Sequence, residues 1–189
     1  MRTLIAFATL AVSLAPAAAL AATDSDTKNV GITGTVSRLC VLGEPSTTLV
    51  NLGQMAETSG ARVGKLTAIA NQTVTLPNSF CNFANSSVTV EATALKAADA
   101  TTPPTGFARA INYTATASGW AATNAAAATS DDGNGGSAAV RGIGSSQPTP
   151  KLSDITLALS GFAVSGDKLL VSGSYNTTVT ITLAPSPAS

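Results

Sequence analysis

Apolar and polar residues alternate with a period of two in one segment after another along this chain. Such alternation is typical of strands that bury one face only. Turn-forming Pro, Gly and Asn residues separate the segments, and none of the intervening stretches has the apolar stripe of an amphipathic helix. The pattern therefore predicts an all-β fold, an antiparallel sandwich or barrel. The alternating segments are 29–37, 39–42, 49–52, 65–76, 87–95, 110–117, 155–159, 169–171 and 175–183.

Residues 1–21 are predicted to form a secretory signal peptide. Arg2 supplies a basic start, and the apolar run from Leu4 to Leu14 is too short to span a bilayer. Ala19-Leu20-Ala21 provides the small residues that precede a cleavage site. We therefore expect a mature chain that begins at Ala22 and folds as one soluble domain outside the cytoplasm.

Cys40 and Cys81 are the two cysteines of the chain. In an oxidising compartment an isolated pair is most simply one disulfide. A disulfide between them would close a loop of about 40 residues and stabilise the fold by about 4 kcal/mol in the chain-entropy model. A free reactive thiol would need a neighbouring base, and the chain has no histidine to serve as one.

The absence of histidine also removes Ser-His-Asp triads, Cys-His pairs and the usual zinc sites. The ten acidic residues show no pairing that would select two of them as glycosidase carboxylates. Ten basic residues balance them, and no basic cluster favours nucleic acid or an anionic membrane. We therefore predict no enzymatic activity, no cofactor, no metal, no nucleic-acid partner and no insertion into a membrane.

Residues 121–147 are a low-complexity stretch of Ala, Ser, Gly and Asn, which predicts a long, exposed, flexible loop. A binding loop is the alternative. The run Asp131-Asp132-Gly133-Asn134-Gly135 lacks the ligand spacing and terminal Glu of a calcium loop, so a solvated turn is expected. Trp120 and Tyr113 flank the stretch. They could stack on carbohydrate, but packing in the core is the expected role.

The segment just before Cys40 has two alternative fates. In extended form Val30, Ile32, Gly34 and Val36 would share one face. This strand can pair within its own domain, or it can leave and complete the sheet of another molecule. The residues themselves leave both alternatives open.

Several motifs together resemble a known family. The alternating arm with Gly34 precedes Cys40, and Cys81 lies in the sequence Thr-Val-Thr-Leu-Pro-Asn-Ser-Phe-Cys-Asn. The last clear strand reads Gly-Ser-Tyr-Asn-Thr-Thr-Val-Thr-Ile-Thr over 173–182. This pattern is similar to bacterial chaperone–usher pilus subunits, most of all to the spore coat protein U-like (archaic, Csu-type) branch.

The resemblance implies an immunoglobulin-like sandwich that is incomplete because its last strand is missing. The groove left by that strand would be filled first by a periplasmic chaperone and then by the arm of the next subunit. An outer-membrane usher is a further implied partner. The arm would be 22–37 and the domain 38–189, with Cys40 and Cys81 joining the first two strands. Gly34 would be the small residue placed where the groove floor is crowded. The implied donor residues are Val30, Ile32, Gly34 and Val36. The implied residues of the C-terminal strand that lies beside the groove are Tyr175, Val179, Ile181 and Leu183.

The end of the chain departs from the family pattern. Pilins of this kind commonly stop at the last strand, whereas here residues 184–189 follow and include two prolines. The prolines should end strand pairing, which puts the usual anchoring of the terminal carboxylate by the chaperone in doubt.

Two hypotheses of function follow. The first is a structural subunit of a bacterial surface fibre, a fimbria or pilus, secreted through the periplasm and joined to neighbouring copies or related subunits. The second is a self-contained secreted β-sandwich that binds a glycan or a protein, with its N-terminal strand folded into its own sheet.

Overall fold

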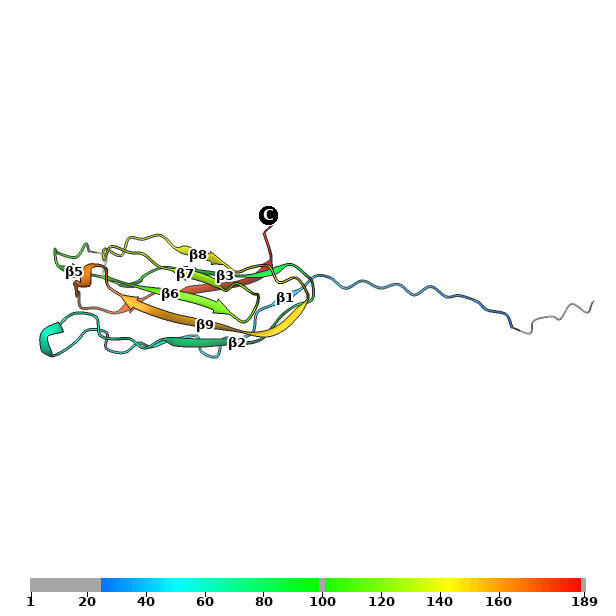
Figure 1. The fold of residues 1–189 in the computed structure, drawn as a ribbon, viewed down its shortest axis with the longest axis horizontal. Coiled ribbons are helices and arrows are strands. Elements are labelled where there is room, and N and C mark those ends of the chain that lie inside the picture. The colour runs from blue at the N-terminus through cyan, green and yellow to red at the C-terminus, as the bar shows by residue number, and fades with distance from the viewer. Residues whose placement is uncertain (1–24, 99–100, 188–189) are drawn as a thin grey trace, which may run out of the picture. The chain divides into compact units, whose positions relative to one another are not determined.

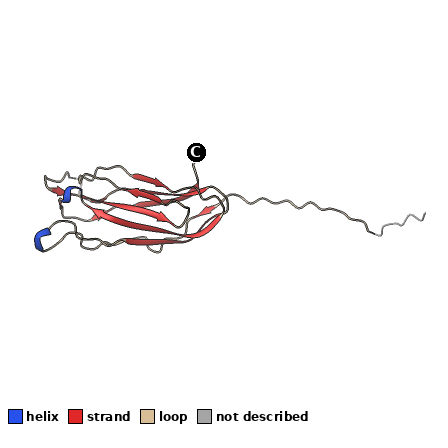
Figure 2. Ribbon diagram, in the orientation of Figure 1, coloured by secondary structure: helices blue, strands red, loops and turns tan. Residues whose placement is uncertain are grey.

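The computed structural model describes residues 25–98 and 101–187. The predicted signal peptide, 1–21, lies outside these residues. The chain divides into two units, Met1–Val36 and Ser37–Ser189, and each is considered by itself. The larger unit, called the domain below, is an all-β sandwich built from antiparallel sheets (Figures 1 and 2). The predicted fold class is confirmed.

The larger sheet of the domain is antiparallel throughout. Its strands follow the order β1-β2-β9-β6-β4-β11, and β7 pairs with β6 outside this path. The strands are β1 (Cys40–Val41), β2 (Gln72–Cys81), β9 (Lys151–Ala163), β6 (Ala110–Ser118), β4 (Leu95–Ala97), β11 (Tyr175–Asn176) and β7 (Ala125–Ala128).

The smaller sheet has the order β12-β3-β8, so that β12 forms one edge. Its strands are β12 (Val179–Pro185), β3 (Ser86–Ala92) and β8 (Val140–Ile143). Two short strands, β5 (Phe107–Ala108) and β10 (Leu169–Leu170), pair in parallel with each other and form a separate two-stranded sheet. The 3₁₀ helices η1 (Gly60–Arg62) and η2 (Ser165–Asp167) lie at the opposite end of the domain from β1 (Figure 2).

The core lies between the two sheets and follows the period-two pattern. Alternate residues of β3, β2, β6 and β9 are buried there, because successive side chains of a strand point to opposite faces. Alanines fill the core where β6 meets β7, at positions 115, 117, 125 and 127, each at most 3% exposed. The larger buried side chains include Val74, Leu76, Val88, Val90, Ile111, Ile155 and Leu157.

The segments β3–β4 and β11–β12 both pass between the two sheets, and they do so next to each other. β3 belongs to the smaller sheet and β4 to the larger, and the same holds for β12 and β11. Between them the Thr177 hydroxyl donates to the Thr93 carbonyl at 2.9 Å. The strand expected over 175–183 is therefore two strands, because the chain changes sheets between Asn176 and Val179.

The prediction of a loop over 121–147 is wrong for two parts of that stretch. Residues 125–128 form β7 and 140–143 form β8, because alanine and glycine suit a place where the sheets approach closely. A Cβ atom on Gly142 would lie 1.9 Å from the carbonyl oxygen of Ala126. Mobility of the remaining loop residues stays a prediction.

The solvated turn expected over 131–135 is only partly correct, because Asp132 and Asn134 are exposed but Asp131 is buried. Asp131 is 5% exposed, and its carboxylate accepts N–H bonds from Gly133, Gly135 and Ser137 at 2.8–2.9 Å. Burial alone would raise the pKa of this carboxyl, but these hydrogen bonds outweigh it and lower the pKa to about 2.

Two further expectations fail around β2. Residues 49–52 form no strand. The strand expected to end at Leu76 continues to Cys81, because Pro77 and Asn78 form a bulge inside β2, where the register with β9 shifts, and not a turn that separates two segments. Asn78 accommodates the bulge with φ 54°.

Candidate subunit-binding groove

An apolar groove of about 630 Å³ opens along one side of the domain. Its first wall is the segment 42–52, its floor comes from β2, β6 and β9, and its second wall is β11 with β12. The apolar residues that line it are Leu42, Pro45, Leu49, Val50, Leu52, Val74, Leu76, Leu95, Tyr113, Leu157, Leu159, Phe162, Tyr175, Val179 and Ile181.

The second wall ends in an unpaired strand edge. β12 pairs with β3 from Val179 to Pro185, and no strand of the described residues pairs with its other edge. Its residues 179, 181 and 183 are only half-buried, although they pack against the core, whereas Thr180 and Thr182 are exposed. An edge of free N–H and C=O groups beside apolar side chains can accept a further strand.

The first wall is held against β2 without forming a ladder with it. The Gly43 N–H donates to Ser79 Oγ at 3.0 Å, and the Ser46 N–H donates to the Thr75 carbonyl at 2.7 Å. A Cβ atom on Gly43 would lie 1.7 Å from the Pro77 carbonyl oxygen, so only glycine fits beside the bulge. These contacts carry the chain along β2 and leave Val50 and Leu52 half-buried on the groove.

Two aromatic rings lie in the floor of the groove. Tyr113 and Phe162 stack with their centroids 5.8 Å apart and an interplanar angle of 22°. The Tyr113 hydroxyl is buried and makes no well-formed hydrogen bond to any of the described residues. Burial raises the pKa of Tyr113, and a weak side-chain hydrogen bond with Thr177 acts in the opposite direction.

The described part of the arm, residues 25–37, contains no strand, and every residue of it is exposed. Val30 is 84% exposed, Ile32 94% and Val36 89%. Isolated apolar side chains on a surface are common, but three with a spacing that gives one apolar face to an extended chain are not. A role for these residues and Gly34 in binding another molecule stays a prediction.

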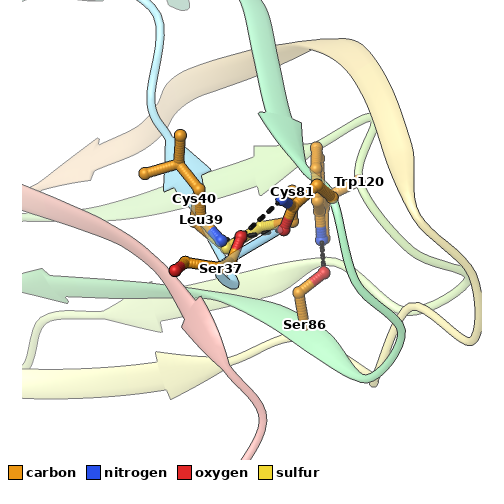
Figure 3. Close-up of a disulfide and its surroundings, with 7 residues drawn as sticks. Ser37, Leu39, Cys40, Cys81, Ser86 and Trp120 are labelled. Carbon is orange, nitrogen blue, oxygen red and sulfur yellow. Dashed lines mark hydrogen bonds between the residues drawn. A yellow bond between two sulfur atoms is a disulfide. The ribbon is translucent and has the colours of Figure 1, made fainter. Parts of the chain in front are cut away.

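The start of the domain is fastened to the turn between β2 and β3. The predicted disulfide between Cys40 and Cys81 is confirmed, and it joins β1 to β2 (Figure 3). Beside it, the Asn82 side chain accepts the Leu39 N–H and donates to the Ser37 carbonyl, both at 2.8 Å. The Arg38 guanidinium lies 4.0 Å from the centre of the Phe83 ring. Residues 37–40 are therefore held in place up to the end of the arm.

The two aromatics considered for carbohydrate stacking are buried in the core. Trp120 and Tyr113 are each 3% exposed. The Trp120 indole N–H donates to Ser86 Oγ at 3.2 Å (Figure 3), and the Lys151 ammonium lies over its ring at 5.8 Å. Core packing is confirmed, and neither ring offers a face to a glycan.

The structure brings together three of the four predicted residues of the C-terminal strand. Tyr175, Val179 and Ile181 line the groove, while Leu183 packs against the core next to it. Sequence reasoning missed Val50 and Leu52 as a groove wall, because their alternation was interpreted as a paired strand. It also missed Phe162, which lies beyond the predicted end of its strand at 159.

Within 25–98 and 101–187, no group of three or more acidic or cysteine side chains is placed to hold a metal. The same residues include no helix long and apolar enough to cross a bilayer. The fold and groove define an antiparallel β-sandwich with one open side. Searches of protein-family models, curated proteins and solved structures find no match to the chain.

Proposed function

We propose that this protein is a structural subunit of a bacterial surface fibre, in which the N-terminal arm of one copy fills the groove of the next. The observation that carries the proposal is the unpaired edge of β12 beside an apolar groove, in a chain that also has an exposed alternating arm. An exposed edge of this kind is an aggregation hazard unless a strand covers it.

The arm and the edge match in length and pattern. Val30 to Val36 spans seven residues, roughly 20 Å when extended at about 3.3 Å per residue. β12 also has seven residues. An added strand would supply the missing ladder bonds, and its alternate side chains would enter the groove, as in β-augmentation.

Gly34 is the member of the arm that suits the crowded part of the floor. The stacked rings of Tyr113 and Phe162 are the bulkiest groups there. A residue placed over them must be small, and we propose that Gly34 takes this position while Ile32 and Val36 enter the space on either side.

Such an arrangement joins different surfaces of successive copies and does not close on itself, so it extends into a fibre. The proposal includes a periplasmic chaperone that covers the groove before assembly and an outer-membrane usher that delivers the subunit to the cell surface. The disulfide supports an oxidising compartment outside the cytoplasm.

The test uses purified mature chain, taken as starting at Ala22. It should form ladders of oligomers that resist cold SDS. Ile32→Asp should abolish the ladder, because a charge cannot enter an apolar groove without a partner. Thr33→Asp is the matched control, since it places the same charge on the opposite face of the extended arm.

The rival hypothesis, a self-contained ligand-binding sandwich, predicts a different outcome. Deletion of 22–37 would then lower the melting temperature of the monomer, and a ligand would raise it. A stable monomer of the full mature chain under assembly conditions would contradict the fibre proposal.

A further inference from the structure

A row of apolar side chains crosses the outer face of the larger sheet, at the end of the domain to which the arm is joined. Val41 of β1 pairs with Phe80 of β2, and Phe80 pairs with Leu152 of β9. Val41 is 41% exposed, Leu152 is 68% exposed and Phe80 is half-buried. Phe80 and Leu152 also border a shallow hollow of about 410 Å³. We call Val41, Phe80 and Leu152 the outer ridge.

The ridge is confined to this end of the sheet. Farther along the same face of β2 and β9 the cross-strand pairs are Thr73 with Ala158 and Thr75 with Thr156, which are polar or small. One charge borders the ridge, because Asp154 is exposed and follows Leu152 by two residues on the same face of β9. Its carboxylate accepts the Asn78 N–H at 2.9 Å, and the Lys151 ammonium donates to the carbonyls of Gly119 and Trp120.

The covalent chain ties the ridge to the arm with little slack. Val36 is the last apolar residue of the arm, and residues 37–40 are held by the Asn82 side chain and the disulfide. Val41 follows five residues after Val36, so the two lie at most roughly 17 Å apart at about 3.3 Å per residue. Leu152 is two strand spacings from Val41, roughly 10 Å.

We propose that the outer ridge is a second contact surface between copies of this chain, buried against the copy that accepts the arm. The inference rests on the proposed fibre. The short covalent connection between Val36 and Val41 identifies the molecule that covers the ridge. Whichever copy holds Val36 in its groove must lie within reach of the ridge. The ridge is too small to hold a dimer by itself, since stable interfaces bury roughly 1,200–2,000 Å². As a contact beside an inserted arm it would set the angle between successive copies.

The experiment measures whether the ridge is covered in fibres. Leu152→Cys is introduced into the full mature chain, and also into a chain with Ile32→Asp and Val36→Asp, which cannot donate its arm and remains monomeric. The rate of thiol modification by a maleimide should be at least tenfold lower in the fibre than in the monomer. Thr73→Cys, exposed on the same face at the far end of β2, should react equally fast in both.

A second measurement separates this proposal from the fibre proposal itself. A synthetic peptide of residues 25–38 is titrated into the arm-blocked monomer with and without Leu152→Arg, and its affinity should be the same in both. Peptide binding, together with equal labelling rates of the Leu152→Cys thiol in fibre and monomer, would overturn the ridge and leave the fibre standing. No peptide binding and no ladder would overturn both.

Discussion

Ile32 offers the sharpest test of whether the arm works inside its own domain or in another copy. Its side chain is 94% exposed, so removing most of it should cost the monomer almost nothing. Surface substitutions usually change the free energy of unfolding by less than about 0.5 kcal/mol. We therefore expect Ile32→Ala to unfold at the same urea concentration as the parent chain.

Association should respond very differently. If Ile32 enters the groove between the walls that carry Leu52 and Ile181, the truncation removes a buried side chain. Such changes cost about 2–4 kcal/mol once the cavity is included. At about 1.4 kcal/mol per factor of ten, the affinity of the arm for the groove should fall roughly 30- to 700-fold.

The assay is a titration of peptides with the sequence of residues 25–38 into the monomeric chain that carries Ile32→Asp and Val36→Asp. The Ile32→Ala peptide is compared with the parent peptide and with Thr33→Ala, which alters the opposite face. Equal affinities for all three peptides would refute the argument. So would an Ile32→Ala chain whose monomer unfolds more easily by about 2 kcal/mol or more, a loss expected of a buried side chain.

Three further predictions concern the domain. Folding lowers the pKa of Asp131 from 3.8 to about 2, so the ionised carboxylate stabilises the folded state by about 2 kcal/mol. This contribution is fully present above the unfolded pKa, and it is lost as pH falls through the folded pKa of about 2. Urea unfolding at pH 5 and pH 2 should show this loss in the parent chain and much less in Asp131→Asn; equal losses would contradict it. Asn82→Ala should cost about 1 kcal/mol of unfolding free energy and speed hydrogen exchange at the Leu39 amide, which unchanged exchange would disprove. Tyr113→Phe should raise the free energy of unfolding by up to about 1 kcal/mol, because the buried hydroxyl that it removes makes only a weak hydrogen bond with Thr177. A loss of about 1 kcal/mol or more would show that this hydrogen bond is strong.

Strand existence was predictable here because the solvent-facing sides of the strands are rich in Thr and Ser. β6 was expected over 110–117 and spans Ala110–Ser118. The break in 175–183 was not predictable, since the alternation runs through it unchanged. It arises from tertiary structure, where Thr93 and Thr177 pass together between the sheets.

Low complexity was a poor guide to structure in 121–147. Alanine and glycine suggested a segment unable to bury surface, yet Ala125 and Ala127 are at most 1% exposed. Small side chains are what a close approach of two sheets requires. Likewise, nothing local marks Asp131 as buried, because its burial depends on Asn112, whose side chain accepts the Asp131 N–H at 2.7 Å.

The two lateral sides of the sandwich differ for a physical reason that bears on function. On the β7–β8 side the side chains are small, and the Ser145 N–H donates to the Thr123 carbonyl at 3.1 Å, so the sheets meet directly. On the β12 side the facing residues are large, among them Leu157, Leu159 and Ile181. Side chains of this size cannot collapse to bring two backbones together, since interiors are close-packed and resist large rearrangements. The open side can therefore be completed by further apolar side chains from outside the domain, and the N-terminal arm is the segment of this chain with the matching pattern.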